Sequence, residues 1–125
     1  MSSDALILHA LRDRQKYRTL ISAVPTTMLA PESQSLLQWY SLYFQAYPEH
    51  DFVDVDAMDA LVRLRSGYSR EQLALIHHAM QMLRQPIDDT AIKGIVNQLY
   101  ERDFSGRAAA LIARYQNGEE VDVVY

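Results

Sequence analysis

The sequence contains no cysteine and only four glycines and four prolines, and its acidic residues outnumber its basic ones. Without cysteine, the chain cannot form disulfide bonds, a thiolate zinc site or a cysteine nucleophile. The formal net charge of −4 argues against a dedicated nucleic-acid-binding protein, because such proteins present a basic surface. No apolar run approaches the ~20 residues that a membrane span needs. These absences favour a cytoplasmic protein that binds no membrane and contacts DNA only indirectly.

Motifs for catalysis are also missing. The chain has no phosphate loop of the type GxxxxGK[ST], no legible Ser–His–Asp arrangement and no two histidines four residues apart on a helix. His77 and His78 are neighbours, and neighbouring helical side chains point about 100° apart, so one helix face cannot present both to a metal. The acidic residues between 49 and 59 lack the glycine and terminal glutamate of a calcium-binding loop. We therefore expect no catalytic, cofactor-binding or metal-binding residue in this chain.

A basic run surrounds the first predicted helix junction. It comprises Arg12, Arg14, Lys16 and Arg18. Such a run could contact phosphate groups, but its spacing around an inward-facing Tyr17 fits a solvated helix face better. We therefore interpret it as solvent-exposed charge.

The residues that are present predict an all-α domain. About half are apolar and eight are tyrosine, which is enough for a modest core in a single domain. The first residues, MSSDALILHAL, carry acidic Asp4 instead of a basic region, so they predict an amphipathic helix and not a signal peptide. Apolar spacings of three and four predict helices over about 4–12, 14–23, 31–47, 57–66 and 70–84.

Capping signals mark where these helices begin. Ser3 and Asp56 are expected N-caps of the first and fourth helices, and Ser69 with Gln72 has capping-box spacing for the fifth. Residues 51–55 alternate but are too short and acidic for a convincing strand, so we expect an extended lead-in. On the fourth helix we expect Met58, Leu61, Val62 and Leu64 to face the core.

The longest predicted helix runs from about Asp89 to Asn117 and has no proline. A helix of about 28 residues is about 42 Å long, whereas the preceding ~90 residues form a ball roughly 25–30 Å across. The helix therefore outruns its own domain, and its free apolar side needs a helix from another subunit. The candidate partner or oligomer interface comprises Tyr100, Phe104, Gly106, Ala108, Leu111, Ile112 and Tyr115. At Gly106 we favour close approach of another helix over a tolerated surface glycine or a kink.

Four segments together resemble the N-terminal domain of hexameric replicative DNA helicases of the DnaB type. They are ALILHALRDRQKYRTLISAV, SLLQWYSLYFQAYPEH, DVDAMDAL and IKGIVNQLYERDFSGRAAALIARYQNG. In that family a long helix leads out of a globular head as the first arm of a helical hairpin, and Arg102 and Phe104 hold comparable places here. The chain departs from the pattern at Asp56, where the family often has threonine, and in the acidic loop before it.

The resemblance implies an architectural function. Residues 1–118 would be a helicase N-terminal, collar-like domain, and residues 119–125 the start of a linker or of a truncated second hairpin arm. Such domains assemble into a dimer or hexamer and dock a primase or a helicase loader. ATP and magnesium would belong to a downstream domain, so this chain itself would not be an enzyme.

Three alternatives remain at this point. The helicase-binding domain of a primase shares this helical plan. A small helical metal protein or enzyme could use His77, His78 and the acidic residues. A helical nucleic-acid-binding adaptor could use the basic run, and its binding would weaken steeply with salt.

Overall fold

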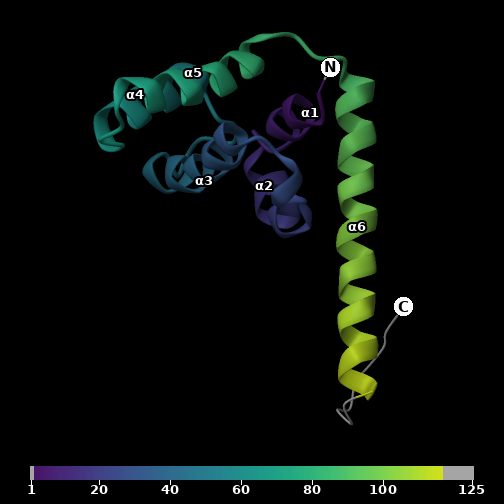
Figure 1. Cartoon of the computed structure of the whole chain (residues 1–125). Coiled ribbons are helices and arrows are strands. Elements are labelled where there is room, and N and C mark those ends of the chain that lie inside the picture. The colour runs from purple at the N-terminus through teal and green to yellow at the C-terminus, as the bar shows by residue number, and fades with distance from the viewer. Residues whose placement is uncertain (1, 117–125) are drawn as a thin grey trace.

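A computed structural model describes residues 2–116 of the chain and the side chains of residues 2–112. This part is all-α, as predicted, and contains no β-strand. Figure 1 shows a head made of the earlier helices, with the last helix running along one side of it and beyond it. The elements are α1 (Ser3–Ala10), α2 (Arg14–Leu20), η1 (Ile21–Ala23), η2 (Thr26–Met28), α3 (Pro31–Ala46), α4 (Val55–Arg65), α5 (Arg70–Arg84) and α6 (Asp89–Gln116), where η denotes a 3-10 helix.

Side chains cap the starts of α1, α2, α4 and α5, and two of these caps differ from the prediction. The predicted capping box of α5 is confirmed, with Ser69 and Gln72 each bonding the other's backbone N–H. On α1 the N-cap is Ser2 and not Ser3. On α4 it is Asp54 and not Asp56, because a start at Val55 buries Val55 against the core. The expected helix over 14–23 is α2 followed by the 3-10 helix η1.

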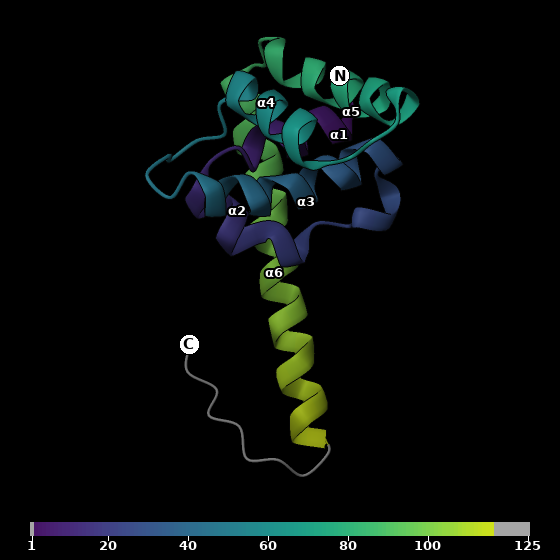
Figure 2. The same cartoon turned by 90° about the vertical axis from the view of Figure 1, so that its left-hand side faces the viewer.

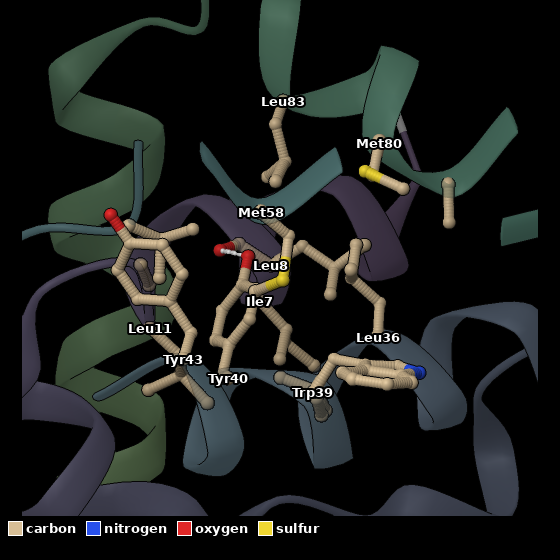
Figure 3. Packing of buried hydrophobic residues seen from close by; sticks show 14 of the residues in the cluster. Ile7, Leu8, Leu11, Leu36, Trp39, Tyr40, Tyr43, Met58, Met80 and Leu83 are labelled. Atoms are coloured by element: carbon tan, nitrogen blue, oxygen red, sulfur yellow. Dashed lines mark hydrogen bonds between the residues drawn. The ribbon is translucent and has the colours of Figure 1, made fainter. Parts of the chain in front are cut away.

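The core is built around α3, whose aromatic side chains are buried as predicted. Figure 3 shows Trp39, Tyr40 and Tyr43 projecting from α3 beneath residues of α1, α4 and α5. The Tyr40 hydroxyl donates a 2.7 Å hydrogen bond to the carbonyl of Leu8. Burial raises the pKa of Tyr40 well above its ordinary value, so this hydroxyl is a permanent donor that joins α3 to α1.

On α4, the expectation that Leu64 faces the core was wrong. Met58, Leu61 and Val62 are buried, but the side chain of Leu64 is 85% exposed. At about 100° per residue, Leu64 points about 120° away from Met58, around the far side of the helix. The spacing of the other three residues already defines one face, and Leu64 lies off it.

Phe52, in the loop between α3 and α4, makes an isolated antiparallel bridge with Asp13. The extended lead-in expected over residues 51–55 is shorter, because Val55 is already the first residue of α4. The backbone N–H of Arg14 donates to the carbonyl of Asp51 at 2.8 Å, and that of Val53 donates to the carbonyl of Arg12 at 2.9 Å. The loop is therefore joined to the α1–α2 junction.

Two members of the basic run, Arg12 and Arg14, are not solvent-exposed charges as predicted. The Arg14 guanidinium donates to the carbonyls of Phe44, Tyr47 and His50. The Arg12 guanidinium donates to the carbonyls of Val53 and Leu83. Both arginines therefore satisfy backbone acceptors where α3 and α5 end and where the loop passes.

Helix α6 packs with its first half against α1, η1 and α2. Its second half extends well past the head, as Figure 2 shows from the side. The prediction that this helix outruns its domain is confirmed. Among the described residues, no helix combines the length and the apolar character needed to cross a membrane.

Candidate assembly surface

The first half of α6 is held by the head through one narrow face. Val96 and Leu99 are buried, and Ile92 and Ile95 are partly buried against the same core. These residues recur every three or four positions, so they form a stripe along one side of the helix. The rest of the helix circumference is left to solvent.

A second apolar stripe lies on a different side of α6. The side chains of Tyr100 and Phe104 are 45% and 65% exposed, and Ala108 and Leu111 are partly buried. Four- and seven-residue spacings place Tyr100, Phe104 and Leu111 within about 40° of one another, whereas Leu99 is about 140° away from Phe104. We call Tyr100, Phe104, Ala108 and Leu111 the α6 stripe.

The remaining predicted interface residues are not on this stripe. Ile112 is 58% exposed, but eight residues of helix turn it about 80° away from Phe104. The side chain of Tyr115 lies outside the described residues. The structure therefore brings together four of the seven predicted positions, with Ile112 flanking them.

Gly106 points toward the opposite side of α6. It lines an open depression between α6 and the η1 region, together with Ser22 and Ala23. A Cβ atom built on Gly106 meets no atom within 4 Å. Within this part of the chain, therefore, no element makes the close approach that we expected at Gly106.

One ion pair lies beside the stripe on the helix surface. Arg107 and Asp103 form an ion pair four residues apart at 3.2 Å, with the arginine side chain 72% exposed. Such exposed pairs contribute only a few tenths of a kcal/mol. The stripe is thus an apolar surface with charged neighbours, and what it can do is pack against another apolar surface.

The other candidate groups do not form a reactive site. His77 lies 4.0 Å from a carboxylate oxygen of Asp59 and 3.0 Å from the Gln81 amide, all at the surface. His78 is exposed beside it. Within residues 2–116, histidine and carboxylate side chains nowhere gather in a group of three or more that could hold a metal ion.

Sequence reasoning missed the exposed apolar side chains of the head. Besides Leu64, they include Phe52 in the α3–α4 loop, which is 60% exposed, and Leu75 on α5, which is 56% exposed. Phe52 does carry a local signal, because an aromatic residue between aspartates in a non-helical segment has no helix face on which to be buried.

Compared with protein-family profiles, with curated proteins and with solved structures, the chain matches none of them.

Proposed function

We propose that this chain is a non-catalytic assembly domain that associates with copies of itself through the α6 stripe. The observation that carries the proposal is that Tyr100 and Phe104 are exposed on α6, with Leu111 in line with them, on a helix whose second half projects beyond the head (Figure 2). An isolated surface hydrophobic residue is ordinary, but several in line on a helix without a partner are typical of an interaction site.

The energetic gain from pairing would be sufficient for a dimer. Fully burying a large apolar side chain is worth about 1.5–3 kcal/mol, and in a symmetric dimer each stripe residue is buried twice. Association costs about 4–15 kcal/mol in lost freedom of motion, and three such residues per copy contribute at most about 9–18 kcal/mol, so the gain is of the size that a dimer needs. The narrow stripe also suits helix-to-helix packing, because its width matches that of a helix seam.

The resemblance to helicase N-terminal domains gives this assembly a context. We propose that the chain forms part of the collar of a replicative DNA helicase and offers a docking surface to a primase or a helicase loader. On this proposal, DNA contact, ATP and magnesium belong to a domain outside residues 1–125. The shape of the chain, a head with one projecting helix, supports this proposal. In a collar such a helix can contact the neighbouring copy while the two heads stay apart.

Sedimentation velocity over a range of concentrations tests the proposal. We expect the parent chain to associate and the double variant Phe104→Ser, Leu111→Ser to bind its copy more than tenfold more weakly. The control is Met28→Ser, Leu42→Ser, which removes two exposed apolar side chains from the head. The assembly proposal fails if the parent stays monomeric both as this chain and in a version extended beyond Tyr125.

A further inference from the structure

One buried hydroxyl group ties the end of α3 to the start of α4. Tyr43 projects from the last turn of α3 (Figure 3), and its side chain is fully buried. The Tyr43 hydroxyl accepts the backbone N–H of Asp54, the N-cap of α4, at 3.0 Å. The same hydroxyl lies 2.6 Å from Nδ1 of His50, in the loop between the two helices. A single oxygen atom therefore joins α3, the loop and α4.

The direction of the bond between Tyr43 and His50 follows from the other bond of the hydroxyl. Because its oxygen already accepts the N–H of Asp54, the hydroxyl hydrogen needs an acceptor of its own. Burial raises the pKa of Tyr43, so the hydroxyl keeps this hydrogen. Among the contacts of residues 2–116, the acceptor in its reach is Nδ1 of His50. Nδ1 is therefore unprotonated, which assigns the hydrogen of the neutral ring to Nε2.

The His50 residue is held in place by further contacts of its ring and its backbone. Its ring stacks on that of Tyr47, with the ring centres 4.8 Å apart. Its N–H donates to the carbonyl of Tyr47 at 3.1 Å, and its own carbonyl accepts from the Arg14 guanidinium at 2.8 Å. The His50 side chain is only partly buried, so a proton from solvent can reach it.

The charges around His50 do not include a carboxylate that pairs with it. The charged residues of the loop and of the α1–α2 junction packed against it are Arg12, Asp13, Arg14, Glu49, Asp51 and Asp54. The two arginines donate to loop carbonyls, and Asp13 and Asp54 are occupied as the N-caps of α2 and α4. Within residues 2–116, the histidine that lies 4.0 Å or less from a carboxylate oxygen is His77. A proton gained by His50 would therefore lose the bond to Tyr43 without gaining an ion pair.

We infer that neutral His50 locks the connection between α3 and α4, and that protonation of its Nδ1 unlocks it. Protonation turns Nδ1 from an acceptor into a donor, so that the Tyr43 oxygen meets two N–H donors and its own hydrogen has no acceptor in a buried site. A buried polar group without a partner is costly, so the contact breaks and the N–H of Asp54 loses its bond. Histidine is the side chain that takes up a proton between about pH 5 and pH 8, so the lock opens on mild acidification. This device is independent of the α6 stripe and of the proposed function.

Hydrogen exchange of single amides, measured by NMR, tests the lock. Protection factors, which correct for the effect of pH on the intrinsic exchange rate, are compared at about pH 8 and about pH 5. We expect the protection of the Asp54 amide to fall at least about tenfold, as the loss of a buried hydrogen bond requires. The amides of Leu37 and Tyr40, in the middle of α3, report opening of the whole head, and their protection should fall less than that of Asp54.

Three variants separate the lock from a general effect of acid. His50→Asn places an amide oxygen near the position of Nδ1 and cannot take up a proton, so Asp54 should stay protected at both pH values. Tyr43→Phe removes the hydroxyl, so protection of Asp54 should be low at both, with a circular dichroism melt to check that the variant is folded. His78→Asn is the matched control, because His78 is exposed on α5, and it should respond to acid as the parent does.

The nitrogen NMR signals of the His50 ring give a second, independent readout. At about pH 8 they should show the hydrogen on Nε2, as the bond from the Tyr43 hydroxyl requires. The inference is overturned if this hydrogen is on Nδ1, if acid lowers the protection of Asp54 no more than that of α3, or if His50→Asn loses the protection of Asp54 in acid as the parent does.

Discussion

Replacing Arg14 by methionine should destabilise the head strongly, although Arg14 sits on a short surface helix. Its guanidinium donates to the carbonyls of Phe44, Tyr47 and His50 at 3.2, 2.6 and 2.8 Å, and lies 4.7 Å from the centre of the Phe44 ring. The Phe44 carbonyl is in the last turn of α3, where carbonyls have no helical partner, and the Tyr47 and His50 carbonyls follow in the chain directly after the helix.

The expected size follows from those three bonds. A hydrogen bond to a charged donor is worth about 1.5–3 kcal/mol, and water can replace part of each because the site is only partly buried. We therefore expect a loss of about 3 kcal/mol in the free energy of unfolding. At about 2.1 cal/mol/K per residue of unfolding entropy, a 125-residue chain should lose about 11 °C in Tm.

Urea denaturation followed by circular dichroism measures this loss. Arg18→Met is the matched control, because Arg18 lies on the same helix and is exposed. Arg14→Lys should recover only part of the stability, since one ammonium group cannot reach three carbonyls as a planar guanidinium does. If Arg14→Met and Arg18→Met differ by less than about 1 kcal/mol, the carbonyl contacts do not hold the end of α3 and this reasoning is refuted.

Three further predictions concern local features. Ser69→Ala should cost about 1 kcal/mol of stability by removing the cap of α5, and an unchanged urea midpoint would contradict it. Gly94→Ala should stabilise the head by about 0.5–1 kcal/mol, because the added Cβ meets open space. Gly67→Ala should destabilise it, because φ is +64° there. In thermal melts the Tm of the two variants should therefore shift in opposite directions. His9 is bonded through Nε2 to the carbonyl of Met82 at 2.8 Å, and burial lowers the pKa of His9 below 6.5. The unfolded chain therefore binds the proton more readily, so stability should fall as the pH drops below about 6.5, and His9→Gln should flatten that part of the pH profile measured by urea denaturation.

The fold could be predicted from the sequence where the signals are local. Helix α5 begins and ends where its capping box and apolar spacing indicate, and the buried aromatic face of α3 follows from its periodicity alone. The projection of α6 beyond the head could be predicted as well. The length of a helix and the diameter of a compact head both follow from the number of residues in them, and here the helix is the longer of the two.

The remaining features depend on residues far apart in the sequence. Arg12 and Arg14 bond carbonyls between 30 and 71 residues away, and no local pattern marks such partners. The choice of Asp54 over Asp56 as a cap is decided by the burial of Val55, which depends on tertiary packing.

Hydrogen exchange of α6, measured by mass spectrometry at several protein concentrations, tests the central claim most directly. Backbone amides of the projecting half have no head to protect them, so they exchange quickly in a free copy, and pairing should protect them by mass action. We predict that protection of residues 104–112 rises with concentration in the parent and not in Phe104→Ser, Leu111→Ser, while that of α3 stays constant. Equal exchange of residues 104–112 at every concentration would contradict self-association through the α6 stripe.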